Sequence, residues 1–196
     1  MDLKPDMALY EMHNRAQAAF QRDMEAANAA EAQLPDISAR AAWAWMVSAG
    51  EVKPNERRAG FHFKYKGFLI NTPDGRKARA QYAKYATEIM LRQHRTHLFT
   101  FYISGCWVRV FYWDRNGCVV SQPANLNTNP ERFANFVFRL LKLTRKRQGY
   151  DDSVQLAKPD EIVQFRNWNP DNQYLREHRE LIFDNEEFYP IYRVSL

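Results

Sequence analysis

The sequence predicts an α/β or α+β fold in which helices flank a mixed β-sheet. Segments with helical periodicity alternate with strand-like segments in the order α, β, β, α, β, β, β, α, followed by a less periodic tail. The 196 residues suffice for one domain with a sizeable core, and the 14% of aromatic residues indicate an aromatic core. We expect a domain over residues 1–155 and a C-terminal extension over 156–196.

The first half of the chain contains two expected helices and two expected strands. Residues 5–33 favour a helix because Ala, Met, Gln and Glu are frequent and no internal Gly or Pro interrupts them. Strands are expected at 43–53, which is apolar, and at 61–71, where aromatic and polar residues alternate. The Pro-Asp-Gly sequence at 72–75 predicts a turn, and a helix should follow over 76–95.

A β-meander and a third helix are expected next. The meander strands are "THLFTFYIS" (96–104), "CWVRVFYW" (106–113) and "CVVSQ" (118–122). Asn116-Gly117 is a strong hairpin signal, and Asp114 should bond the backbone of that turn. The helix should occupy 128–148, with Asn129 as its N-cap and basic residues in its last turn.

The strand over 43–53 ends in "GEVK", which allows two interpretations. Glu51 and Lys53 project to the same side of a strand, so they either mark a solvated strand end or point together into a site. In a site, Glu51 would bind Mg²⁺ through oxygen, and Lys53 would orient an attacking water or stabilise developing charge. A second carboxylate is needed, and Asp36 in "LPD" is the candidate.

The next helix adds Gln81 and Tyr85, which lie one turn apart on one face. Pro35-Asp36, Glu51-Val52-Lys53 and "QYAKY" together resemble the PD-(D/E)XK nuclease superfamily, more closely its RecB-type branch. The resemblance implies a restriction-endonuclease-like fold and a cofactor of Mg²⁺ or Mn²⁺. It also implies Asp36 and Glu51 as metal ligands, Lys53 as the assistant of the water, and Gln81 and Tyr85 as residues that line the site. An acid of the first helix often completes such a site, and the candidates are Glu11, Glu25 and Glu31.

A second resemblance covers about residues 35–155. Gln93–Thr96, the turn Trp113–Gly117 and Gly149-Tyr150-Asp151 resemble the N-terminal region of the basidiomycete-type fungal protein kinase family. That region of the family also has a Trp-led strand ending in Glu-x-Lys. The two resemblances therefore agree on a nuclease-like domain placed ahead of a kinase domain.

The sequence nevertheless lacks the motifs that a kinase needs. It has no G-x-G-x-x-G phosphate loop, no H-R-D catalytic loop and no D-F-G, so we expect no ATP site and no kinase activity. The extension over 156–196 would lead to an absent kinase lobe, in either a truncated copy or an excised front domain. Two functions remain open: a Mg²⁺-dependent DNA nuclease, or a non-catalytic regulatory or interaction domain.

The charge pattern gives further expectations about partners. The net charge of +5 is compatible with nucleic acid, and the basic cluster in 142–148 could bind a phosphate backbone or simply end a helix. Near the proposed site, the residues expected to hold DNA are Arg57, Arg58, Arg76, Lys77 and Arg79. A kinase domain or another protein is the alternative partner. The sequence shows neither a signal peptide nor a membrane span, so we expect no membrane partner and an intracellular location, cytoplasmic or nuclear.

Overall fold

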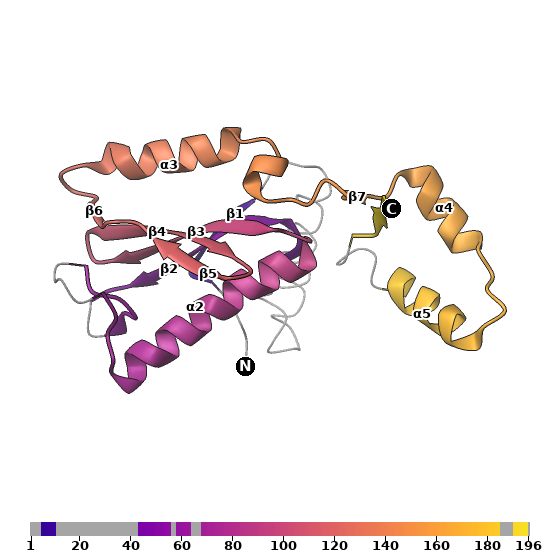
Figure 1. Cartoon of the computed structure of the whole chain (residues 1–196), viewed down its shortest axis with the longest axis horizontal. Coiled ribbons are helices and arrows are strands. Elements are labelled where there is room, and N and C mark those ends of the chain that lie inside the picture. The colour runs from indigo at the N-terminus through magenta and orange to yellow at the C-terminus, as the bar shows by residue number, and fades with distance from the viewer. Residues whose placement is uncertain (1–4, 11–42, 56–57, 64–67, 185–189, 196) are drawn as a thin grey trace, which may run out of the picture. The chain divides into compact units, whose positions relative to one another are not determined.

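The computed structural model describes residues 5–10, 43–55, 58–63, 68–184 and 190–195. The chain divides into two compact units, Met1–Tyr150 (unit 1) and Asp151–Leu196 (unit 2). Strands and helices occur in both units, so the predicted mixed α/β class is confirmed (Figure 1). The division between the units falls after Tyr150, whereas the sequence suggested residue 155.

A mixed six-stranded sheet forms the centre of the described part of unit 1. Its main path runs β1-β2-β3-β4-β5, and β6 pairs with β4. Only β2 and β3 are parallel among these pairs; the other neighbours are antiparallel. The strands are β1 (Met7–Tyr10), β2 (Met46–Lys53), β3 (His97–Ser104), β4 (Trp107–Asp114), β5 (Gly117–Val120) and β6 (Ala124–Asn125).

Strand β2 is a central strand, and a single 3-10 turn, η1 (Trp43–Trp45), leads into it. Its first six residues are buried, which explains why the run is apolar rather than alternating. The ring of Phe101 on β3 lies where a side chain of Gly50 would be. Gly50 therefore allows the close approach of the Phe101 ring to the β2 backbone.

Helix α2 (Pro73–Arg92) connects β2 to the parallel strand β3, as a crossover between parallel strands requires. The expected turn at 72–75 is wrong, because these residues start the helix. Thr72 is the N-cap, its hydroxyl accepts a hydrogen bond from the Gly75 amide at 3.1 Å, and Pro73 occupies the first turn.

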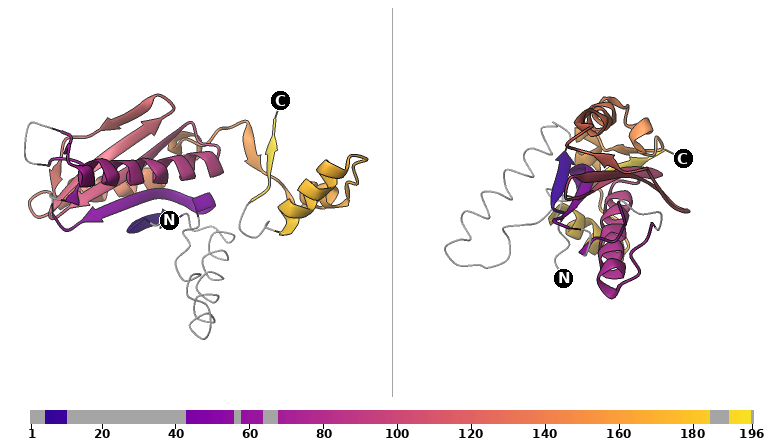
Figure 2. Two further views of the ribbon diagram at one scale, coloured as in Figure 1. Left: turned by 90° about the horizontal axis from the view of Figure 1, so that it is seen from below. Right: turned by 90° about the vertical axis from the view of Figure 1, so that its left-hand side faces the viewer.

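Helix α3 (Pro130–Lys142) covers the opposite face of the sheet from α2, which gives unit 1 three layers (Figures 1 and 2). Ring centroids of Phe133 and Phe101 lie 5.1 Å apart on this side. The expected helix over 128–148 begins as predicted, with Asn129 as N-cap, but ends six residues early. Leu143 is extended, and the basic segment continues as the 3-10 turn η3 (Lys146–Gln148).

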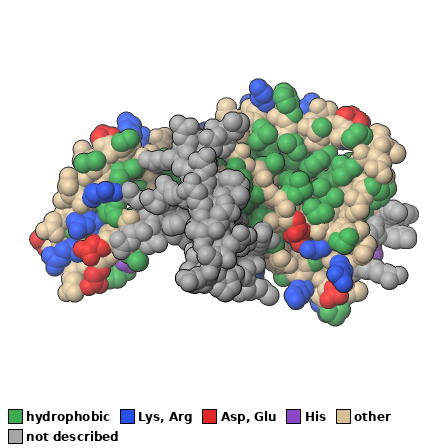
Figure 3. Space-filling model, turned by 180° about the vertical axis from the view of Figure 1, so that it is seen from behind, with side chains coloured by type: hydrophobic (Ala, Val, Ile, Leu, Met, Phe, Trp, Pro, Cys, Tyr) green, Lys and Arg blue, Asp and Glu red, His purple; other side chains and the backbone are tan. Residues whose placement is uncertain are grey.

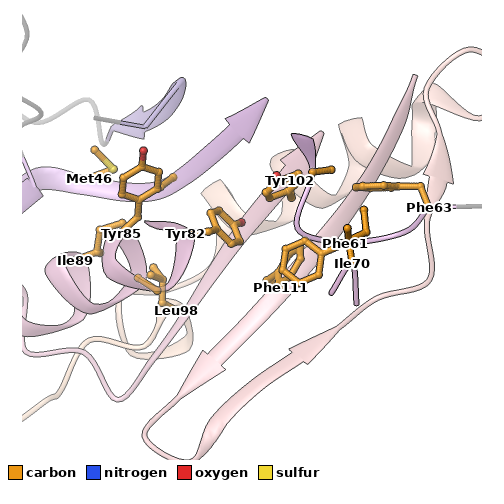
Figure 4. Packing of buried hydrophobic residues seen from close by; sticks show 13 residues of the cluster. Met46, Phe61, Phe63, Ile70, Tyr82, Tyr85, Ile89, Leu98, Tyr102 and Phe111 are labelled. Carbon is orange, nitrogen blue, oxygen red and sulfur yellow. The ribbon is translucent and has the colours of Figure 1, made fainter. Parts of the chain in front are cut away.

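Aromatic side chains fill the core between α2 and the sheet (Figure 4). Tyr82 lies edge-on against Tyr102 at 5.2 Å and against Phe111 at 5.1 Å between ring centroids. The Thr100 hydroxyl accepts hydrogen bonds from Tyr82 Oη at 2.6 Å and from Trp113 Nε1 at 2.7 Å. The buried polar tips of these rings are thereby paired.

Two predicted elements of the first half are wrong where the structure describes them. Residues 7–10 form strand β1, not helix, because they pair antiparallel with β2, and this pairing outweighs local helix propensity. The described parts of the segment 61–71, residues 61–63 and 68–71, form no strand, and Phe61 and Leu69 make an isolated bridge. Its apolar side chains, including Phe61 and Ile70, enter the core from a loop.

The guanidinium of Arg95, which is 3% exposed, joins three separate segments of unit 1. It donates hydrogen bonds to the carbonyls of Met46, Val47 and Gln148 at 3.1–3.2 Å. It also donates to Tyr150 Oη at 2.6 Å and lies 4.0 Å from the centroid of that ring. The start of β2, the end of α2 and the segment before residue 151 are therefore held by one side chain.

The described part of unit 2 contains two short strands and two helices, where the sequence suggested a less periodic tail. They are β7 (Val154–Leu156), α4 (Pro159–Asn167), α5 (Gln173–Asp184) and β8 (Tyr192–Val194). The two strands pair antiparallel, and Phe165 of α4 packs on Phe183 of α5 at 5.4 Å. None of the described helices of the chain has the length and hydrophobicity that a membrane crossing requires.

Candidate functional site

Glu51 and Lys53 lie at the carboxyl end of β2, and their side chains share one face of the strand. The Lys53 ammonium contacts Glu51 Oε1 directly. Glu51 is 2% exposed, whereas the Lys53 side chain is 22% exposed. The predicted common direction of these two residues is confirmed, and a buried carboxylate is thereby paired with a partly accessible cation.

Asp6 is the second carboxylate at this position, and sequence reasoning missed it. Its Oδ2 atom accepts a hydrogen bond from the Val52 amide at 2.8 Å. Val52 follows Glu51 in β2, and the charge of Asp6 acts on the carboxyl of Glu51, so the two carboxylates lie beside each other. No local signal marks Asp6 in the sequence, since its position depends on the pairing of β1 with β2.

Gln81 and Tyr85 of α2 lie on the same side of the sheet as Glu51 and Lys53. Gln81 Nε2 donates a hydrogen bond to Tyr85 Oη at 2.6 Å, so the predicted common helical face is confirmed. Tyr85 points from α2 toward β2, beside Met46 (Figure 4). Burial and the charge of Glu51 raise the pKa of Tyr85 to about 12, against a smaller lowering by Gln81. The hydroxyl of Tyr85 therefore stays protonated near neutral pH.

The pKa of the Glu51 carboxyl is the result of effects that oppose one another. Burial, the largest effect, raises the pKa of the Glu51 carboxyl above its ordinary value of 4.5. The ammonium of Lys53 lowers this pKa, and the negative charge of Asp6 raises it again. The net direction is upward, so a second positive charge near Glu51 and Asp6 would stabilise the ionised pair.

The donor set at this position fits a divalent cation. Glu51 Oε2 is buried and has no hydrogen-bond partner in the described part of the chain. Together with the Asp6 carboxylate it offers hard oxygen ligands, and Mg²⁺ is commonly held by one or two carboxylates plus water. No cluster of three or more His, Cys, Asp or Glu occurs among the described residues. The described part of the chain therefore offers two carboxylates at this position, those of Asp6 and Glu51.

Several predicted site residues lie outside the described residues. These are Asp36, the predicted second metal ligand, the three first-helix acids Glu11, Glu25 and Glu31, and the basic residue Arg57. Of the five residues predicted to form the catalytic group, the structure brings together Glu51, Lys53, Gln81 and Tyr85.

The remaining basic residues near the site have different surroundings. Arg79 donates hydrogen bonds to the carbonyls of Gly60 and Ile70 at 2.8 and 2.6 Å, so it holds the loop before α2. Arg76 donates to the Asn71 carbonyl at 2.9 Å. Lys77 and Arg58 are exposed. Only part of this basic group therefore has its charge directed to solvent.

The turn that carried the family resemblance has the structural role expected for it. Asp114 Oδ1 accepts hydrogen bonds from the amides of Asn116 and Gly117 at 2.8 and 3.1 Å. Gln93 and Arg95, from the other resembling segment, are buried and bonded to each other. The residues that resemble the family thus maintain the fold of unit 1.

The chain matches the model of a known protein family. Residues 68–188 match the model of the family described as fungal protein kinase, a range that runs from the loop before α2 into unit 2. The match includes Gln81 and Tyr85 but not Asp6, Glu51 or Lys53, and the nuclease resemblance gains no support from it. No curated protein and no solved structure matches the chain. Because the match spans more than half of its residues, the chain belongs to the fungal protein kinase family.

Proposed function

We propose that Asp6 and Glu51 bind a divalent cation, Mg²⁺ or Mn²⁺, and that this site hydrolyses phosphodiester bonds of DNA. One observation carries the proposal: Glu51 Oε2 is buried and lacks a hydrogen-bond partner among the described residues, and a second carboxylate lies beside it. An unpaired buried carboxylate oxygen costs free energy unless a cation or a proton compensates it.

Each residue of the group has a role that its surroundings support. The cation would polarise the scissile phosphate and lower the pKa of a bound water. Lys53, held on Glu51 Oε1, would place its ammonium next to the phosphate oxygens and stabilise the charge that develops there. Gln81 and Tyr85 would support Glu51 from α2, with Tyr85 as a neutral hydrogen-bond donor.

The DNA backbone would be held by exposed basic residues near the carboxyl end of β2. Lys77 and Arg58 are exposed, and Arg76 combines exposure with its bond to the Asn71 carbonyl. Arg79 would act indirectly through the loop that it holds. The roles predicted for Asp36 and Arg57 remain predictions that belong to this proposal.

The first test measures cation binding by titration calorimetry with MgCl₂ and MnCl₂. We expect the wild-type protein to bind a cation, and Glu51→Gln and Asp6→Asn to weaken the affinity at least about tenfold, since each removes one anionic ligand. Glu88→Gln is the matched control, because Glu88 is a carboxylate of α2 that pairs with Arg92 instead. Equal affinity in all four proteins would contradict the proposed site.

The second test measures cleavage of plasmid and single-stranded DNA with each cation. Lys53→Ala should retain cation binding but lose about a hundredfold or more in rate, as for removal of one charge-stabilising donor. Lys84→Ala, an exposed lysine of α2, is its control. Tyr85→Phe and Gln81→Ala should lower the rate less. If the wild-type protein binds the cation but cleaves no DNA, the proposed hydrolysis is wrong and the proposed cation site is retained.

A non-catalytic regulatory or interaction domain is the second candidate function. The family match favours this candidate, because the matched range 68–188 does not contain Asp6, Glu51 or Lys53. In that case a kinase domain or another protein would be the partner, and the cation site would stabilise β1 on β2. Cation-dependent stability without any cleavage would favour this candidate over the first.

A further inference from the structure

The solvent side of α3 carries two parallel stripes of different chemistry. Arg132, Arg139 and Lys142 recur at intervals of seven and three residues, so they form one basic stripe. Ala134, Phe138 and Leu141 recur at intervals of four and three and form an adjacent apolar stripe. All six are exposed, with Phe138 at 62% and Leu141 at 48%.

The packing of α3 explains why these stripes face away from the sheet. Phe133, Phe136 and Leu140 occupy the remaining arc of the helix, where Phe133 packs on Phe101 and Phe136 on Phe99 of β3. Leu140 is 2% exposed. The packing of α3 on the sheet therefore does not need Phe138 or Leu141. Two neighbouring exposed apolar side chains of this size indicate a binding surface.

The basic stripe extends beyond the helix. The span 132–147 contains six basic residues and no acidic residue. In the part of the chain that the structure describes, no acidic side chain pairs with Arg132, Arg139, Lys142 or Arg147. Figure 3 shows basic and hydrophobic side chains next to one another along the upper edge of unit 1, at the height at which Figure 1 places α3.

This surface is separate from the carboxylate site. Lys53 is paired with Ser104 at one end of β3, whereas His97 at the other end contacts the Arg147 carbonyl of η3 at 3.1 Å. The basic residues of η3 are therefore about 23 Å along β3 from the carboxylate site, counted over the seven steps between Ser104 and His97. In addition, α3 covers the opposite face of the sheet from α2. A ligand on the α3 surface is therefore not the substrate held at Glu51.

We propose that the two stripes of α3 bind single-stranded nucleic acid. A single strand has anionic phosphates along one edge and flat aromatic bases along the other, which matches a basic stripe beside an exposed aromatic ring. The Lys142 ammonium lies 5.6 Å from the Phe138 ring centroid, so the two chemistries meet at one point. In a duplex the bases are stacked on one another inside the helix, so no base is available to stack on Phe138. This binding needs no cation and no hydrolysis.

The test is fluorescence anisotropy with a labelled single-stranded DNA of about 16 nucleotides and the full chain in EDTA. We expect wild-type binding in the micromolar range, and a weakening of at least about tenfold in R139E/K142E. Between about 50 and 200 mM KCl, the slope of log affinity against log salt should fall by at least about 1.4 in this variant. The matched control is K84E/R115E, which reverses two exposed cations elsewhere and should change affinity less than about threefold.

A second variant separates stacking from charge. Phe138→Ala should weaken single-strand binding about 5- to 100-fold and leave the salt slope unchanged. Leu91→Ala, which truncates a side chain that is 69% exposed on α2, is its control and should have no effect. The assay contains EDTA and no divalent cation, so failure of the proposed hydrolysis leaves this inference intact.

Four outcomes would overturn the inference. Equal weakening in R139E/K142E and K84E/R115E would show a general charge effect. No effect of Phe138→Ala, or duplex DNA bound as tightly as the single strand, would exclude base stacking. An acidic peptide of equal charge that binds as tightly, with the same loss in Phe138→Ala, would identify a protein partner instead.

Discussion

Asp6 Oδ2 accepts a hydrogen bond from the Val52 amide at 2.8 Å, although 46 positions separate the two residues. The bond is made where β1 pairs with β2, and it fixes a carboxylate next to Glu51. Asp6 therefore lies next to Glu51 only while β1 is paired with β2.

We expect Asp6→Asn and Asp6→Ala to separate these two effects. The Asn variant keeps an oxygen acceptor for the Val52 amide, so its free energy of unfolding should stay within about 0.5 kcal/mol of wild type. The Ala variant should lose about 1 kcal/mol more, because it leaves the amide without that acceptor. Urea denaturation measures both. Equal stabilities of the two variants would show that the hydrogen bond does not hold β1.

Glu51→Gln should change the pH dependence of stability. Because the pKa of Glu51 is raised in the folded chain, its contribution to stability is fully present below about the ordinary value of 4.5 and is lost as the pH rises through the folded pKa. Without added cation, wild type should therefore lose stability relative to Glu51→Gln as the pH increases toward neutrality. Urea denaturation at several pH values tests this, with Glu88→Gln as the control. A difference that is constant with pH would be inconsistent with a raised pKa.

Thr100→Val should destabilise unit 1 by about 2 to 4 kcal/mol, because the change removes the acceptor of two buried donors, Tyr82 Oη and Trp113 Nε1. The two side chains have almost the same shape, so packing is little affected. Thr87→Val is the matched control, since Thr87 bonds only the Ala83 carbonyl on the exposed face of α2. Thermal denaturation should show a large loss for Thr100→Val and little change for Thr87→Val. Similar losses in both would show that the loss does not come from the two buried donors.

Gly149→Ala should be far more destabilising than Gly105→Ala. Both glycines have a positive φ, +101° and +56°, so alanine strains the backbone at each by about 1 to 2 kcal/mol. Only at Gly149 would the added Cβ meet a backbone atom at clashing distance, the carbonyl oxygen of His97. We expect Gly149→Ala to add at least about 2 kcal/mol to that strain. Denaturation curves with equal midpoints would contradict this difference.

Much of the central sheet could be predicted because the signals there are local. The Asn116-Gly117 hairpin, the apolar run of β2 and the Pro130 start of α3 are determined by neighbouring residues. The same holds for Gln81 and Tyr85, whose spacing of four places them on one helical face. Local spacing and strand alternation therefore suffice to pair Glu51 with Lys53 and Gln81 with Tyr85, whereas the grouping of the two pairs came from the nuclease resemblance.

The elements that were predicted wrongly, or not at all, depend on tertiary contacts. Strand β1 has the composition of a helix and becomes a strand only because β2 offers an edge, so Asp6 could not be identified from local pattern. The segment 61–71 alternates as a strand does, yet Phe61 and Phe63 enter the core from a part that is outside the strands of the described structure. In unit 2, α4 and α5 are short and mostly exposed, and their weak periodicity gave no helical signal.

The bonds of Arg95 have a consequence for motion within unit 1. A local opening that displaces Arg95, which follows the end of α2, would leave the carbonyls of Met46, Val47 and Gln148 without this donor. An opening of the start of β2 or of the turn η3 would leave the buried guanidinium without part of its acceptors. These three segments should therefore exchange their amide hydrogens with similar protection and open as one cooperative unit. Hydrogen exchange would then detect a single subglobal event in wild type and three unequal ones in Arg95→Ala.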